Sequence, residues 1–404
     1  MAQSLEEQMN MVERALGERM VNHALALVRA WMQETGDEPA LLDEFNRIYE
    51  AYKTLFNDWL VEDNDSYDTQ LDELTGRAYR LVDTIYVRLR LKRGLSPEMH
   101  GFNGDNAQSV AHYFGTCLTL TEGDFEWLRT CLQDEERAAI GLMAVASLAK
   151  NLREVFNEQA ICVLIEGINA ANSVVGEQCL ANLIILMAHY DVRIDFFPEL
   201  QDTLTEALDD GQTAFEVMCA LVRSSYYSLR DLMAENEKSI DDLPSELKAL
   251  LDSTGAGESL ETVSAWVPAS EKEYISGLIQ ILPDTWIYSL IIGEDLERQQ
   301  TMKFIYLSIG RMDLLWNETE AAERWLVNHL RGNKVKPIDY INYGHCLLLR
   351  GDRIMAFENY RQAREMCKNS KSFLTLFRPD RHQLVEHGVP LEQVYLIEDQ
   401  LLNV

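Results

Sequence analysis

The stretch 337–370 has a spacing of small and large residues that strongly limits how it can fold. Gly344 and Ala356 lie on either side of Gly351-Asp352, where Gly suits a helix end and Asp can cap the next helix. Only small side chains fit where two helices cross closely. The spacing therefore predicts a helical hairpin with Gly344 and Ala356 at the crossing. Tyr340, Leu347 and Tyr360 are the large residues expected to fill the space around that crossing, and Tyr343 and Ala363 complete the pattern.

The same pattern occurs once more upstream. Tyr306, Gly310 and Ala322 precede Tyr340, Gly344 and Ala356 by 34 residues each. Three matches in one register predict a second, more divergent hairpin over about 303–336. This copy departs from the pattern at Asp313, where a large residue is expected.

This pattern resembles the tetratricopeptide repeat over 303–370. The segments 339–345, 373–380 and 388–402 also look like the ending of large uncharacterised bacterial tetratricopeptide proteins, in which helical repeats resembling 134–210 come first. The resemblance implies an α-helical scaffold and brings no catalytic residues with it. The Lys and Asn pattern of members that bind chaperone tails is absent, so capture of a C-terminal carboxylate is not expected.

The composition predicts helices nearly throughout. The 404 residues include only 9 prolines and 21 glycines, and 47% are hydrophobic, which is enough to bury a core. A first helix is expected over 4–34, opened by a Ser4–Glu7 capping box, with further helices over 39–60 and 69–92. Two short helices are expected after residue 372.

Four regions follow from boundary and repeat signals. An N-terminal helical bundle over 1–94 is expected to end at a Gly- and Pro-bearing boundary. Helices resembling HEAT repeats are expected over 107–238, because the motif at Glu136 recurs 41 residues later at Glu177. A polar loop or hinge over 239–269 then leads to a tetratricopeptide-like domain over 270–404 with terminal capping helices. The fold class is all-α, an α-solenoid of helical hairpins.

Charge is very unevenly distributed along the chain. Residues 301–404 hold 14 basic and 13 acidic side chains, a net charge of +1, which leaves −31 for residues 1–300. Such an acidic region repels phosphate and anionic lipid, so neither nucleic acid nor membrane is an expected partner. The charge fits a basic protein partner, and it also fits a surface that only maintains solubility.

Cysteine usage and the N-terminus indicate the compartment. Seven cysteines without a CxxC pair, mostly among apolar neighbours, are typical of buried free thiols in a reducing environment. No signal sequence or bilayer-spanning apolar run is evident. A cytoplasmic location is expected, while the oligomeric state is left open.

Motifs for catalysis are absent from the sequence. It contains no HExxH, GxSxG, Walker loop or dinucleotide-binding glycine fingerprint, and no cofactor or metal is expected. Asp63, Asp65 and Asp68 imitate the start of a calcium loop, but Leu74 stands where a bidentate acidic ligand is required. The sequence therefore favours a non-catalytic interaction scaffold. The alternative is an all-α enzyme whose acidic active site is assembled from scattered residues.

Helical spacing also predicts a partner-binding strip. Residues of the first helix of each hairpin that do not pack against the second helix should face one side, forming an apolar strip with one cation and one imidazole. The alternative is that neighbouring helices of the same chain fill this side. The six residues of the strip are Leu307, Arg311, Leu314, Ile341, His345 and Leu348.

Overall fold

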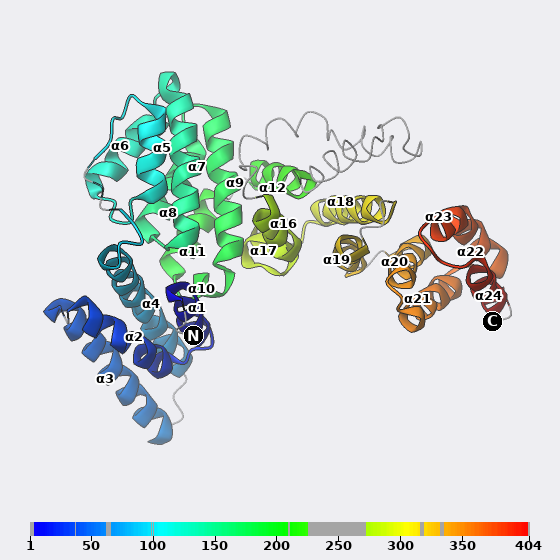
Figure 1. Cartoon of the computed structure of the whole chain (residues 1–404), viewed down its shortest axis with the longest axis horizontal. Helices are drawn as coiled ribbons and strands as arrows, with labels where there is room; N and C mark the ends of the chain where they lie inside the picture. Colours follow the sequence, from blue (N-terminus) through cyan, green and yellow to red (C-terminus); the bar gives the residue numbers. More distant parts are fainter. Residues whose placement is uncertain are drawn as a thin grey trace. The chain divides into compact units, whose positions relative to one another are not determined.

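The computed structural model confirms the all-α class. Every regular element in the described residues is an α-helix or a short 3₁₀ helix (Figure 1). Residues 225–271, which include the predicted hinge 239–269, lie outside the described part. The structure describes residues 4–36, 38–61, 66–97, 99, 101–208, 211–224, 272–315, 319–331 and 335–402.

The chain forms two compact units. The first comprises Met1–Ala214 and Thr285–Ile287, and the second comprises Phe215–Asp284 and Tyr288–Val404. The boundary predicted at 94–106 therefore does not separate two units, because the helices before and after it belong to the same one. The change of unit falls instead within the helix that follows residue 211.

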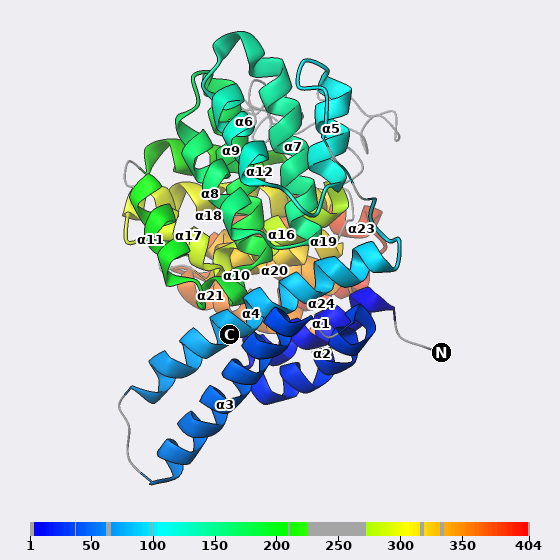
Figure 2. The ribbon, with the colours of Figure 1, turned by 90° about the vertical axis from the view of Figure 1, so that its left-hand side faces the viewer.

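The N-terminal part contains four helices rather than the three predicted. They are α1 (Leu5–Gly17), α2 (Val21–Thr35), α3 (Pro39–Val61) and α4 (Tyr67–Lys92). The capping box is present, with Glu7 N–H donating to Ser4 Oγ at 3.1 Å. The single helix predicted over 4–34 is wrong, because Arg19 adopts φ 57° and Met20 N–H closes the turn on the Ala15 carbonyl at 2.8 Å. Figure 2 shows α3 and α4 running side by side.

The rest of the first unit contains the helices predicted around the 41-residue repeat. α9 is buried on all sides, in keeping with its almost continuous apolar sequence from Val175 to Ala188. α7 packs against both α5 and α9. The helices are α5 (Ala107–Thr116), α6 (Glu122–Leu132), α7 (Ala138–Glu154), α8 (Glu158–Glu166), α9 (Ser173–His189), α10 (Asp191–Ile194) and α11 (Pro198–Ala207).

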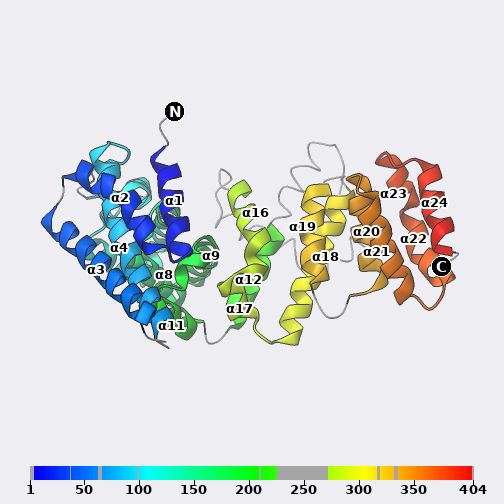
Figure 3. The ribbon, with the colours of Figure 1, turned by 90° about the horizontal axis from the view of Figure 1, so that it is seen from below.

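The second unit contains a row of helices in chain order (Figure 3). Its best-packed neighbours are the pair α18 and α19 and the pair α20 and α21, and α19 also contacts α20. The helices are α12 (Gln212–Ser224, shared with the first unit), α16 (Lys272–Ile281), α17 (Trp286–Ile292, also shared with the first unit), α18 (Leu296–Leu315), α19 (Thr319–Leu330), α20 (Pro337–Leu349), α21 (Arg353–Met366), α22 (Ser370–Phe377), α23 (Arg381–Glu386) and α24 (Leu391–Leu402).

Two boundaries in this unit differ from the sequence interpretation. α18 begins about two turns before residue 303, because Asp295 Oδ1 accepts from the N–H groups of Glu297 and Arg298 at 2.9 and 3.1 Å. The C-terminal end has three α-helices where two were expected. The additional helix, α22, is capped by Asn369, whose side chain accepts from Ser372 N–H at 2.8 Å.

Candidate functional site

The glycines of the repeat pattern lie at close helix crossings. A Cβ added at Gly344 would lie 2.4 Å from Tyr360 Cε1, and one added at Gly310 would lie 2.7 Å from Leu326 Cγ. Ala322 and Ala356 have no exposed surface. The hairpins α18–α19 and α20–α21 therefore cross through small residues in the same 34-residue register.

The other residues of the pattern divide into core and surface. Leu347, Tyr360 and Ala363 are buried, and Gly351 ends the first helix of its hairpin with φ 88°. Tyr306 is buried and stacks on Trp325, with ring centroids 5.7 Å apart. Its counterpart in the next hairpin, Tyr340, remains partly exposed, as does Tyr343.

The strip predicted to bind a partner does not form a solvent-facing surface. Leu314, Ile341, His345 and Leu348 are buried, and only Leu307 and Arg311 keep partial exposure. α22, the helix that was not predicted, packs against α20 and covers its part of the strip, while Leu314 is buried with Ala322 and Leu326 of α19. The α22 residues Phe373, Leu374 and Phe377 share one apolar core with Ile341 and Leu348. The same chain thus fills most of this side.

His345 is held by hydrogen bonds within that core. Its Nδ1 lies 2.9 Å from the Tyr360 hydroxyl, and its Nε2 lies 3.3 Å from Asp380 Oδ2. Burial raises the pKa of Tyr360 well above its usual value, so its hydroxyl keeps its proton. Both contacts are satisfied when Nε2–H donates to Asp380 and Nδ1 accepts from Tyr360. His345 therefore joins α20, α21 and the segment before α23.

A second polar contact joins the two hairpins. His329 of α19 has Nδ1 2.8 Å from the Lys303 carbonyl oxygen, and its Nε2 lies 3.1 Å from Asp339 Oδ2. A carbonyl can only accept, so Nδ1 carries a proton. Asp339 also accepts from Lys336 N–H at 2.7 Å at the start of α20. The Nδ1–H hydrogen bond thus links α19 to α18, and Asp339 at the start of α20 attracts the ring only when Nε2 also carries a proton.

An open groove lies on the other side of the second hairpin. It has a volume of about 490 Å³ and runs between Leu330 at the end of α19, Tyr340 and Tyr343 of α20, and one face of α21. We call it the α21 groove. The α21 residues that line it are Met355, Glu358, Asn359, Arg361, Gln362 and Glu365.

Polar groups that line the α21 groove are held in place by hydrogen bonds to one another and to the backbone. Gln362 Nε2 donates to the Tyr340 hydroxyl at 3.2 Å, and Asn359 Nδ2 donates to the Met355 carbonyl at 2.8 Å. Arg361 pairs with Glu358 at 2.6 Å, so the rim carries both charges. Two aromatic rings, a methionine and two amides in one concave site can bind an extended peptide.

Sequence reasoning missed the α21 residues of this groove. The predicted strip takes residues from the first helix of each hairpin only, whereas these side chains lie on the second helix, α21. The signal was present, because Met355, Glu358, Asn359 and Gln362 follow the i, i+3, i+4, i+7 spacing of one helix face.

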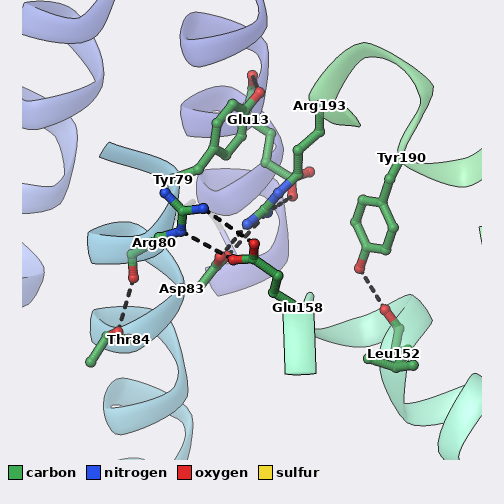
Figure 4. Close-up of polar contacts among 9 residues, drawn as sticks. All are labelled: Glu13, Tyr79, Arg80, Asp83, Thr84, Leu152, Glu158, Tyr190 and Arg193. Carbon is green, nitrogen blue, oxygen red and sulfur yellow. Dashed lines mark hydrogen bonds and ion pairs between the residues drawn. The ribbon is translucent and has the colours of Figure 1, made fainter. Parts of the chain in front are cut away.

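Arg193 marks a second polar cluster, in the first unit (Figure 4). It is buried, its Nη1 lies 3.1 Å from Asp83 Oδ1, and Glu13 Oε1 is 3.8 Å away. The guanidinium also faces aromatic rings, with the centroids of Phe156 and Tyr79 at 3.9 and 4.5 Å. These residues come from α1, α4, α10 and the segment between α7 and α8.

The electrostatics of this cluster indicate a structural role. Burial raises the pKa of Glu13, against the opposing effect of Arg193. Although burial works against its charge, the Asp83 carboxylate keeps the pKa of Arg193 above its ordinary value. A hidden acidic active site would need such carboxylates beside a cleft, but here the cation and rings occupy the space around Asp83. We infer that the cluster holds helices together.

Other functional classes gain no support from the described residues. They contain no group of three or more His, Cys, Asp or Glu side chains able to hold a metal ion. All seven cysteines are free thiols, five of them buried, and burial raises the pKa of Cys179, Cys219 and Cys346 to about 12. Such thiols are unreactive at neutral pH. None of the helices in the described part of the chain is long and apolar enough to cross a bilayer.

Comparison with known proteins gives no match. No family model, no curated protein and no solved structure matches this chain. A function therefore has to be inferred from the residues themselves.

Proposed function

We propose that this protein is a non-catalytic scaffold or adaptor, and that the α21 groove binds an extended segment of a partner protein. The observation that carries the proposal is the groove itself, which places Tyr340, Tyr343 and Gln362 around one open concave site. Tyr side chains contribute large contact areas at low entropic cost and are enriched at binding sites.

The repeat pattern supports this proposal. Gly310 and Gly344 stand 34 residues apart at equivalent crossings, as tetratricopeptide units require. We extend the proposal to the architecture, an α-solenoid of helical hairpins with tetratricopeptide-like units in the second unit and HEAT-like pairs α7–α8 and α9–α11 in the first. Repeat arrays of this kind commonly present elongated binding surfaces. The free thiols are compatible with a reducing compartment, and we place the protein in the cytoplasm.

The chemistry of the groove indicates the kind of segment that would bind. Its floor is aromatic and apolar, and its rim pairs Arg361 with Glu358, so it offers no strong net charge. An extended segment with one apolar anchor side chain and free backbone groups would match it. Gln362 can exchange its contact with Tyr340 for one with a peptide carbonyl.

Selection of random peptides on the purified protein tests this proposal. Peptides recovered on the native chain should share an apolar anchor, and Tyr340→Ala should weaken their binding about tenfold or more. Tyr340→Phe, which keeps the ring, should retain most of the affinity. Binding would be measured by fluorescence anisotropy.

A matched control separates the groove from general surface contact. Tyr274 of α16 is also a partly exposed tyrosine, and Tyr274→Ala should leave the affinity unchanged. If Tyr340→Ala and Tyr274→Ala bind the selected peptides as tightly as the native chain, the groove is not the binding site and the proposal fails.

A further inference from the structure

The end of α3 exposes several large apolar side chains together. Phe56, Trp59 and Leu60 are 43%, 53% and 62% exposed. Phe56 and Trp59 stack with ring centroids 5.9 Å apart, and Trp59 lies 6.2 Å from the ring of Tyr67 on α4. In Figure 2, this end of α3 and the start of α4 extend beyond α1 and α2. Clusters of exposed rings are uncommon on a surface without a binding role.

A hollow adjoins these rings. It measures about 280 Å³ and is lined by Tyr49, Tyr52, Lys53 and Phe56 of α3, together with Asn22 of α2. Within it, Lys53 Nζ lies 5.3 Å from the centroid of the Tyr49 ring. The protein's own lysine thus shows that a cation can occupy the face of a ring here. We call the rings and the hollow together the α3 tip.

Charge around the α3 tip is strongly acidic. The described residues of 50–73 include five carboxylates and a single basic side chain, Lys53. Lys53 is paired with Glu50 at 3.0 Å, and Asp72 is paired with Arg19 at 2.6 Å. Asp58, Asp68 and Glu73 are exposed. An anionic membrane would be repelled, and so would the same tip of a second copy. The carboxylates in this part are Glu50, Asp58, Asp68, Asp72 and Glu73.

We propose that the α3 tip is a docking surface for a basic, amphipathic segment of another protein. Leucine or aromatic side chains of that segment would cover Phe56, Trp59 and Leu60, and its Lys or Arg side chains would face the carboxylates and the exposed ring faces. This surface lies in the first unit and is independent of the α21 groove, so either site can be tested without the other.

The probe is a fluorescein-labelled synthetic peptide of Lys and Leu at helical spacing, roughly four turns long. Two matched peptides isolate its features, one with Glu in place of Lys and one with Gln in place of Leu. The Lys–Leu peptide should bind tightest in fluorescence anisotropy, and its affinity should fall as salt rises. Equal binding of all three would overturn the proposal, because neither charge nor apolar contact would then matter.

Two exposed aromatic residues provide the decisive pair of variants. Trp59→Ala should weaken binding of the Lys–Leu peptide about tenfold. Tyr395 of α24 is 50% exposed, close to the exposure of Trp59, and Tyr395→Ala should leave binding unchanged. If the two variants behave alike, the peptide does not dock at the α3 tip.

Charge reversal provides a second pair that leaves the core intact. Asp58→Lys at the tip and Glu126→Lys on α6 alter exposed carboxylates and change the net charge equally. Asp58→Lys should weaken binding up to about fivefold, and Glu126→Lys should have no effect beyond experimental error. Equal weakening by both would show general attraction to an acidic protein and would contradict a specific surface.

Discussion

Two kinds of contact, one in each unit, hold helices together by different chemistry. In the second unit, α18–α19 and α20–α21 approach through Gly310 and Gly344, so backbone and ring atoms pack directly. In the first unit, α4 and α10 are joined by Arg193 and Asp83, charged residues 110 positions apart in the chain. Close packing through glycine needs no desolvation of charge, whereas the buried ion pair depends on both partners being present.

This difference leads to different sensitivities to substitution. A glycine crossing fails when volume is added, because the facing side chain has no space to move into. A buried ion pair fails when one partner is removed, because the other is left charged in an apolar site. The stability of the first unit should also depend on pH. The titratable group is His189, which lies next to Tyr190 with ring centroids 4.4 Å apart.

The largest effect is expected from Arg193→Met. It removes the buried hydrogen-bonding partner of Asp83, and should lower the free energy of unfolding by about 3–5 kcal/mol. Thermal unfolding followed by circular dichroism would detect this. The double variant Arg193→Met/Asp83→Leu should recover much of the loss.

Arg14 provides the control for Arg193. It pairs with Glu18 at 3.1 Å on the surface, and its side chain is 81% exposed. Arg14→Met should change stability by less than about 1 kcal/mol. If Arg14→Met lowers the free energy of unfolding as much as Arg193→Met does, burial of the Arg193–Asp83 ion pair does not explain its contribution to stability.

Adding volume at the glycine crossings should have the next largest effect. Gly344→Leu forces a side chain against the fully buried ring of Tyr360 and should cost about 3 kcal/mol, at the upper end for overpacking. Gly310→Leu meets the smaller side chain of Leu326 at 2.7 Å, a longer contact than the 2.4 Å at Gly344, and should cost about 1–2 kcal/mol.

Gly277 of α16 is the matched control for both substitutions. A Cβ there meets no atom within 4 Å, so Gly277→Ala should stabilise its helix by up to about 1 kcal/mol. We expect the melting temperature to be highest for Gly277→Ala, followed by the native protein, then Gly310→Leu, and lowest for Gly344→Leu. Were Gly344→Leu to melt with the native protein, the close crossing of α20 and α21 would be refuted.

A smaller effect is expected from pH. Burial lowers the pKa of His189 to about 4, assisted by the positive charges of Arg153 and Arg193. The unfolded chain therefore takes up the proton first, near pH 6.5, and the folded protein loses stability as pH falls from there toward 4. Between pH 7 and pH 5 the loss should be about 2 kcal/mol.

His189→Asn isolates this contribution. The asparagine does not titrate, so the difference in unfolding free energy between native protein and variant should change by about 2 kcal/mol over the same pH range. Glu13, whose pKa is raised by burial, acts in the opposite direction and is common to both proteins. If the unfolding free energies of the two proteins change in parallel with pH, His189 does not take up a proton more readily in the unfolded chain than in the folded protein.

The sequence predicted the features that repeat or alternate locally. Gly310 and Gly344 could be located because their spacing recurs, and α3 and α4 because their apolar residues follow a helical period. The contact between Asp83 and Arg193 could not be predicted, because a single long-range pair leaves no periodic signal. The break between α1 and α2 was also hidden, since Arg19 takes a left-handed conformation that usually signals glycine.

The predicted binding strip shows a different limit of sequence reasoning. Ile341 and Leu348 were correctly placed on one face of α20, but whether that face meets solvent depends on α22. The short helix Ser370–Phe377 lacks the length to give a clear periodic signal. The α21 face of the groove could have been predicted from the sequence, because its residues follow the same helical spacing on the second helix of the hairpin.

Photo-crosslinking from within the α21 groove tests the proposed function most directly. A photoreactive amino acid at Gln362 would be compared with one at Lys371, an exposed position at the start of α22, in cells that express the full chain. We expect position 362 to form discrete adducts with a partner protein, and Tyr340→Ala to abolish them, while position 371 forms none. Adducts of equal yield from both positions, or adducts that persist in Tyr340→Ala, would contradict partner binding through the α21 groove.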